Sequence, residues 1–146
     1  MTALAVALVV AGGIGGAVQA ALMGRWGERS GTLEAFAFAT LLTALIGAAV
    51  LLVGRGSLAG YATAARAPVW LWTAGAFSAL IVVGLTYAAP RLGTTAAVGI
   101  VVAGNLAMGV VIDRFGLFGL ERIPFGWERI LGVVLLTLGA ALSLRR

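Results

Sequence analysis

The stretch from Gly93 to Arg114 carries an amide and a carboxylate at a spacing that could contact a solute or a partner. Asn105, Gly109 and Asp113 recur at every fourth residue, so they stack on one face of an α-helix. The amide both donates and accepts hydrogen bonds, and the glycine leaves room beside it. A helix that faces lipid has no use for this row, whereas a helix that faces a partner or a wet cavity does.

The other polar side chains inside apolar stretches are of two kinds. The amide of Gln19, like that of Asn105, cannot satisfy all its donors and acceptors within its own helix, so it either joins helices or contacts a substrate. A hydroxyl can bond the carbonyl four residues earlier and have no further role. Thr43 and Ser78 are nevertheless secondary candidates for a substrate cavity. The deep hydroxyls are Thr40, Thr43, Ser78 and Thr137.

Asp113 is the only aspartate of the chain, and it falls where the helix is expected to end. The helix dipole disfavours a negative charge at that end, so the carboxylate needs a cation. We expect an ion pair with Arg129, either as a structural tie for the intervening loop or as a gate.

Catalytic chemistry has no candidate residues. The chain contains neither cysteine nor histidine, so it lacks nucleophile–histidine pairs and the usual metal-ligand motifs. We therefore expect no enzyme, no catalytic or metal-binding residue and no cofactor. Proton-coupled export of cationic compounds is a weaker alternative, because the nearest carboxylate, Glu34, is expected at the membrane interface rather than at mid-membrane.

The composition is that of a membrane protein with one domain. Of 146 residues, 62% are hydrophobic and only 10% are charged, against about 25% charged in soluble domains. The net charge of +5 comes from arginines spaced singly between apolar runs, which does not indicate nucleic-acid binding. The expected surroundings are the lipid bilayer, and no cleaved signal peptide is expected because residues 1–3 carry no basic side chain.

The apolar runs predict an all-α integral membrane bundle of five transmembrane helices in a single domain. A run of 22 residues spans about 33 Å as a helix, which matches the hydrocarbon core with modest tilt. The connection before the last span contains glycines and a proline that break helices, so it is expected to lie in the interface. The predicted spans are 2–23, 32–53, 68–89, 93–113 and 130–144, with the interfacial loop at 114–129. No internal repeat is evident.

Glycines predict where helices pack. Gly12 and Gly16 form a GxxxG pair, and Gly132 and Gly139 lie seven residues apart in the last span. Both patterns, together with Gly109, suit close approach of helix backbones.

The arginines give no preferred orientation. With five spans, five arginines fall on each side of the membrane, whereas topology normally follows an excess of Lys and Arg on the cytoplasmic side. This balance predicts chains that insert both ways and pair antiparallel, giving an inverted-repeat transporter; alternatively a partner subunit fixes the orientation. One side holds Arg55, Arg66, Arg114, Arg122 and Arg129, and the other holds Arg25, Arg29, Arg91, Arg145 and Arg146.

Several short motifs follow one another in a familiar order. They are Pro68-Val69-Trp70, Pro90-Arg91-Leu92-Gly93, Ala103-Gly104-Asn105 and Ile112-Asp113-Arg114-Phe115-Gly116-Leu117. The chain resembles the YdcZ-type family of the drug/metabolite transporter superfamily. The resemblance implies half of a ten-helix inverted-repeat transporter. Asn105 stands where the family usually has glutamine, and Arg114 where histidine is usual.

These observations predict an inner-membrane, multi-pass transporter of a small organic solute. It would work by alternating access, as a homodimer or with a homologous five-span chain, and Gln19 and Asn105 would face the cavity. The alternative is a non-transporting membrane subunit that stabilises or orients a partner.

Overall fold

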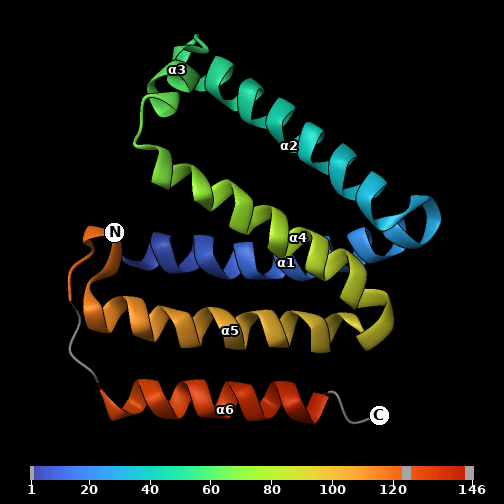
Figure 1. Cartoon of the computed structure of the whole chain (residues 1–146), viewed down its shortest axis with the longest axis vertical. Helices are drawn as coiled ribbons and strands as arrows, with labels where there is room; N and C mark the ends of the chain where they lie inside the picture. Colours follow the sequence, from blue (N-terminus) through green and yellow to red (C-terminus); the bar gives the residue numbers. More distant parts are fainter. Residues whose placement is uncertain (1, 123–125, 144–146) are drawn as a thin grey trace. The chain divides into compact units, whose positions relative to one another are not determined.

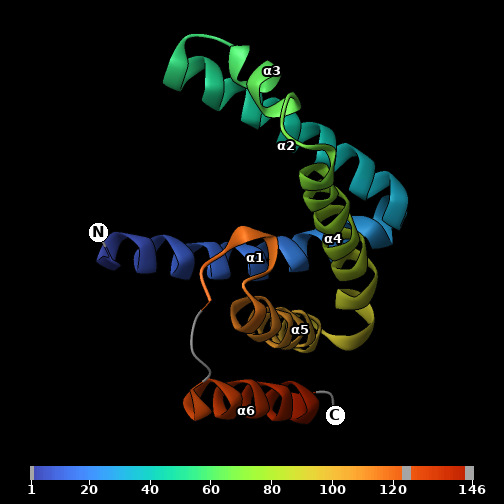
Figure 2. The same cartoon turned by 60° about the vertical axis from the view of Figure 1, so that its left-hand side comes forward.

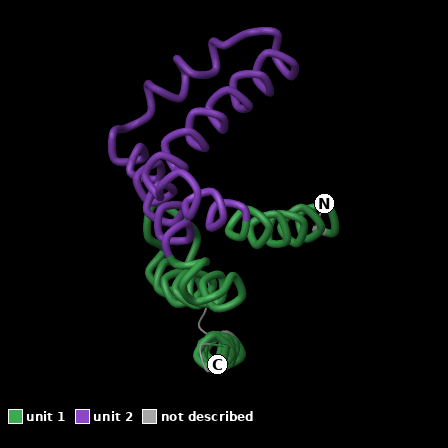
Figure 3. Tube along the Cα trace, turned by 90° about the vertical axis from the view of Figure 1, so that its right-hand side faces the viewer, with its two compact units in different colours: residues 1–21, 88–146 green, residues 22–87 purple. Residues whose placement is uncertain are grey.

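A computed structural model describes residues 2–122 and 126–143, and every regular element in these ranges is helical (Figure 1). The chain divides into two compact units, residues 1–21 with 88–146 and residues 22–87 (Figure 3). Each unit is described separately below. The elements are α1 (Thr2–Ser30), α2 (Thr32–Arg55), α3 (Ala59–Ala65), η1 (Val69–Trp72), α4 (Thr73–Leu92), α5 (Thr94–Phe115), η2 (Leu117–Gly119) and α6 (Trp127–Ser143).

In the unit formed by residues 1–21 and 88–146, α5 and α6 pack side by side (Figures 1 and 2). Small residues allow this approach: a Cβ built on Gly99 would lie 3.4 Å from the Cβ of Ala140. Ala96, Ala97 and Ala140 are buried. Close packing of small residues is the usual basis of helix association in lipid, and it fixes the pair of helices that forms the candidate site.

In the unit formed by residues 22–87, the end of α1 crosses α4 at Gly27. A Cβ on Gly27 would lie only 2.8 Å from Cγ2 of Thr86. Thr86 is 1% exposed, and its hydroxyl donates to the carbonyl of Val82 at 2.7 Å. The threonine thus satisfies its hydroxyl within its own helix while its methyl group fills the space that Gly27 leaves.

The short helix α3 folds back along α2 in the same unit. The Tyr61 hydroxyl donates to the carbonyl of Ala44 at 3.2 Å, and a Cβ on Gly60 would lie 3.2 Å from a methyl group of Leu51. The predicted spans 32–53 and 68–89 left residues 54–67 as a connection without a helix of its own. The helix forms because the alanine-rich segment after Ser57 has high helical propensity and has α2 to pack against.

Two single glycines join consecutive helices. Gly31 (φ 98°, ψ 146°) lies between α1 and α2, and Gly93 (φ 87°, ψ 148°) lies between α4 and α5. In each joint the glycine N–H donates to the carbonyl four residues earlier at 3.0 Å. The glycine carbonyl then accepts from the amide four residues later, Ala35 at 3.1 Å or Ala97 at 3.0 Å. Few L-residues other than glycine adopt these angles, so the same joint occurs twice although the sequence showed no repeat.

Four helical stretches have the length and composition of a membrane span: Ala3–Ser30, Thr32–Arg55, Val69–Leu92 and Thr94–Phe115. The fifth apolar helix, Ile130–Ser143, is shorter, and its 14 residues extend about 21 Å against a hydrocarbon core of about 30 Å. The helical membrane bundle is thus confirmed in its all-α character, while a fifth span remains a prediction.

Residues 24–31, between the first two predicted spans, are helical up to Ser30 rather than a loop. Helix α1 continues to Ser30 although Gly24 and Gly27 have low helix propensity. Arg25 Nη1 lies 3.1 Å from Glu28 Oε2, and Gly27 packs against Thr86 of α4, so a local ion pair and a helix contact support this last part of α1. The polarity marks the end of the apolar span but not the end of the helix. In the predicted loop 114–129, α5 ends at Gly116 and α6 begins at Trp127.

Replacing the glycine of a joint is expected to destabilise the fold. Gly93→Ala places a Cβ on a backbone with φ 87°, which costs about 1–3 kcal/mol. Gly75→Ala is the matched control, since Gly75 lies inside α4 and its added Cβ meets nothing within 4 Å; it is expected to be neutral or to gain up to about 1 kcal/mol. Thermal unfolding in detergent measures both, and equal losses in the two variants would contradict the role of the joint.

The Gly27–Thr86 contact gives a second test. Gly27→Ala is expected to cost about 1–3 kcal/mol because its Cβ overlaps the Thr86 methyl group. Thr86→Ser removes that methyl group, so Gly27→Ala should cost clearly less in the Thr86→Ser background, with a coupling of about 0.5–3 kcal/mol. A double-mutant cycle by thermal unfolding measures the coupling, and additive effects would show that the two residues do not meet.

Candidate functional site

An open pocket of about 410 Å³ lies between helices α5 and α6. The pocket brings together three residues that the sequence placed on one helical face, Asn105, Gly109 and Asp113, with Gly132 of α6. Its volume falls in the range of small-molecule sites. Its lining consists of Asn105, Leu106, Gly109, Val110, Asp113, Gly132, Val133 and Leu136.

The two glycines keep this pocket open. A Cβ added to Gly109 or to Gly132 would meet no atom within 4 Å, so neither glycine is needed for contact between α5 and α6. At Gly99, by contrast, the added Cβ already meets Ala140. The chain's own packing therefore uses Gly99 and leaves Gly109 and Gly132 facing unfilled space.

Asn105 carries the polar group at the centre of the pocket. It is the twelfth of the 22 residues of α5, and it lies about 16 Å from either end of the helix. Its side chain is exposed and forms no hydrogen bond with another described residue. An amide left without partners in an apolar medium costs roughly 2–7 kcal/mol, so the pocket offers a strong hydrogen-bonding group to whatever enters it.

Asp113 closes the pocket two turns beyond Asn105. Its side chain is half-buried in the last turns of α5. The predicted ion pair between Asp113 and Arg129 stays a prediction, since the side chain of Arg129 lies outside the described residues. Nearby, the side chain of Arg122 packs over Gly116, where an added Cβ would lie 2.7 Å from Arg122 Cγ.

A second pocket of about 420 Å³ lies farther along the same pair of helices. Leu136 lines both pockets, and Gly139, the other glycine of the predicted α6 stripe, lines this one. Its polar groups are the hydroxyls of Thr94, Thr95 and Ser143, and Ala17 of α1 completes it. These hydroxyls were not among the predicted site residues, although their positions at the ends of two apolar runs could have indicated them.

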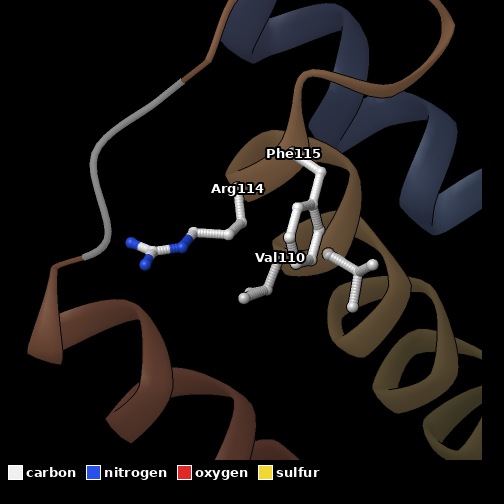
Figure 4. A pocket seen from close by; sticks show the side chains of 4 residues that line it. Val110, Arg114 and Phe115 are labelled. Atoms are coloured by element: carbon white, nitrogen blue, oxygen red, sulfur yellow. The ribbon is translucent and has the colours of Figure 1, made fainter.

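A third pocket, of about 400 Å³, lies at the end of α5 and is lined by Val110, Val111, Arg114 and Phe115. Figure 4 shows the Arg114 side chain reaching away from the helix while the Phe115 ring lies beside Val110. Val110 also lines the pocket of Asn105, so the two pockets are neighbours along α5.

The remaining predicted site residues lie elsewhere. Gln19 is exposed on α1 and lines none of the pockets described here, so its place in a cavity with Asn105 stays a prediction. Thr43 belongs to the unit of residues 22–87, and its hydroxyl donates to the carbonyl of Ala39 at 2.9 Å. Ser78 is exposed on α4 in that same unit.

The deep threonines behave as local chemistry predicts. Thr40 donates to the carbonyl of Phe36 at 2.9 Å and Thr137 to that of Val133 at 2.8 Å. Together with Thr43, three of the four deep hydroxyls are satisfied by their own helices, as expected. The carboxamide of Asn105 is thus a polar group at mid-span that its own helix does not satisfy.

Acidic groups do not gather into a site. Glu34 lies in the first turn of α2 with its carboxylate folded over Gly31, at the end of the helix rather than at its middle. Within residues 2–122 and 126–143, no group of three or more acidic side chains is placed to hold a metal ion.

Glycines of α1 also face open space. A Cβ on Gly12 or on Gly16 would meet nothing within 4 Å, so the predicted GxxxG pair is not closed by another helix of the described chain. Its role in pairing with a second chain remains a prediction.

Comparison with known proteins identifies a family. A family model described as "Putative inner membrane exporter, YdcZ" matches residues 4–142. Searches among curated proteins and among solved structures return no match. The inner-membrane location in this description agrees with the four long apolar helices. The chain is therefore a multi-pass inner-membrane protein, and it belongs to the YdcZ family of the drug/metabolite transporter type.

Proposed function

We propose that the chain is half of an exporter of a small organic solute, and that it works by alternating access as an antiparallel pair. The observation that carries this proposal is the pocket between α5 and α6, with the Asn105 amide at mid-span and two unfilled glycine positions beside it. A substrate site at mid-membrane is what alternating access requires, because both sides must reach it in turn.

The pocket chemistry fits a solute with hydrogen-bonding groups and an apolar body. Asn105 offers one acceptor and two donors, and the leucine and valine side chains of the lining offer an apolar wall. Asp113 lies at the outer end of the pocket, in the last turns of α5, where it can act on a solute that enters or leaves.

The balanced arginines support the antiparallel pair. If the chain has five spans, five arginines lie on each side, and the charge difference that normally selects one orientation is absent. Two inverted copies then supply the two halves that larger members of a transporter superfamily carry in one chain.

A second function has its own support. The open positions at Gly12 and Gly16 give α1 a surface onto which a helix of another protein can pack. In that case the chain is a non-transporting subunit that stabilises or orients a partner, and the partner fixes its topology.

Removing the amide is expected to weaken solute binding and to reduce flux. Purified protein is screened by thermal shift against a panel of small metabolites and organic cations, and each stabilising compound is then followed in proteoliposomes. Asn105→Leu should weaken binding by about 5- to 150-fold, since a lost hydrogen bond to a buried group costs about 1–3 kcal/mol. Asn105→Gln keeps the carboxamide and should retain most of the binding.

Thr137→Val is the control for this test, because the Thr137 hydroxyl bonds its own helix and lines neither pocket of the α5–α6 pair. Unchanged flux in Asn105→Leu would remove this residue from the mechanism. Adding Gln19→Leu to each variant measures whether the α1 amide contributes, as predicted.

The orientation of the chain can be measured directly because the natural sequence has no cysteine. Ser30→Cys and Ser57→Cys place a thiol at opposite ends of α2. A membrane-impermeant maleimide should label about half of each variant from outside intact cells, with lysed membranes giving the total.

Removing two arginines from one side should then select one orientation. Arg25→Ala with Arg29→Ala leaves three arginines against five, so Ser30→Cys should become mainly external and Ser57→Cys mainly internal. Complete labelling of one thiol and none of the other, without these changes, would exclude the antiparallel pair.

A further inference from the structure

The pocket of Asn105 is open on the side that neither α5 nor α6 covers. Its polar centre, Asn105, has no hydrogen-bond partner among the described residues. Lipid cannot supply one. The group that completes this pocket therefore comes from outside the α5–α6 pair.

We infer that a second, inverted copy of the chain completes the pocket, and that the two Asn105 carboxamides meet at the two-fold axis. This inference rests on the proposed antiparallel pair and adds the residues through which the pair is made. It makes the site incomplete in a single chain.

The depth of Asn105 in the membrane is compatible with contact between two inverted copies. A two-fold axis in the membrane plane carries each residue to the same distance on the other side of the midplane, so only residues at mid-depth can meet their own copies. Asn105 is the twelfth of the 22 residues of α5, which places it at the middle of that helix. An inverted α5 therefore brings a carboxamide to the same depth.

The carboxamide is also self-complementary. Each amide has a carbonyl acceptor and N–H donors, so two amides related by a two-fold axis can exchange two hydrogen bonds in a closed pair. A single hydroxyl or a carboxylate at this position would not satisfy itself in this way. The pairing uses one N–H and the carbonyl of each amide, and the second N–H of each stays available to a solute.

The unfilled positions beside Asn105 and the charge of Asp113 are also compatible with an inverted pair. The positions above Gly109 and Gly132 are unfilled, so a second helix can approach the α5–α6 face closely. When α5 is inverted, its C-terminal turns with Asp113 come level with the N-terminal turn of the other α5, the helix end that favours negative charge. A parallel pair would instead place the two Asp113 carboxylates at one level.

Cysteine cross-linking tests the pairing in membranes, because engineered thiols are unique in this chain. Val98 and Ile112 lie seven residues before and after Asn105, on nearly the same line of α5. In an inverted pair Val98 of one chain faces Ile112 of the other, whereas in a parallel pair each residue faces its own copy.

Val98→Cys and Ile112→Cys are co-expressed with different tags and oxidised with copper phenanthroline. The mixed disulfide should exceed either homodimer at least fivefold, while Asn105→Cys alone should give a homodimer within disulfide reach. Leu45→Cys, exposed at mid-depth of α2, measures random collision. The Val98 and Ile112 variants keep Asn105, so their result does not depend on tolerance of a substitution there.

Two outcomes would overturn the inference, and they are distinguishable from failure of the proposed function. Homodimers of Val98→Cys and Ile112→Cys without the mixed product would show a parallel pair. Background cross-linking throughout, in chains that maleimide labelling finds in both orientations, would show that inverted copies meet elsewhere, and the proposed exporter would stand. A single orientation in the labelling experiment would instead remove the antiparallel pair itself.

Discussion

The bilayer core contains no water, so every polar group inside it must find its partner in protein or solute. Helices satisfy the backbone, and the deep threonines of this chain satisfy themselves. Thr40, Thr43 and Thr137 each bond the carbonyl four residues earlier, and the fully buried Thr86 does the same. A carboxamide is different, because one carbonyl of its own helix cannot match its donors and its acceptor. The α5–α6 face therefore needs a hydrogen-bonding partner for Asn105 from outside this pair of helices.

The glycines show which surfaces the chain uses within itself and which it leaves for other molecules. Gly27 and Gly99 are contact points, since a side chain there would meet Thr86 or Ala140. Gly31 and Gly93 are needed for their backbone angles. The glycines beside Asn105 belong to neither class. Glycine lowers helix stability by about 1 kcal/mol relative to alanine, and the packing of α5 against α6 does not require glycine at positions 109 and 132.

The row of Asn105, Gly109 and Asp113 could be predicted from the sequence, because helical periodicity alone determines which residues share a face. It also placed Gly132 on the last helix as a packing residue, and the structure puts this glycine across the pocket from Asn105. Periodicity could not show that α6 is the helix opposite α5, because that choice depends on contacts such as Gly99 with Ala140. For the same reason, the grouping of Gln19 with Asn105 stays a prediction.

Boundaries were less predictable than faces, for a physical reason. Polarity marks where a span leaves the hydrocarbon, whereas helix ends follow backbone conformation. Helix α1 therefore runs past its apolar part until Gly31 turns the chain, and α3 forms inside a segment that polarity assigned to a loop. Hydropathy predicts whether a residue lies in lipid or in water, whereas a glycine with positive φ marks the residue at which a helix ends and the chain turns. A helix that ends at such a glycine cannot slide along its neighbour without breaking the joint, so the joint also fixes the depth of the residues that follow it. Through Gly93, the depth of Asn105 follows from the position where α5 begins.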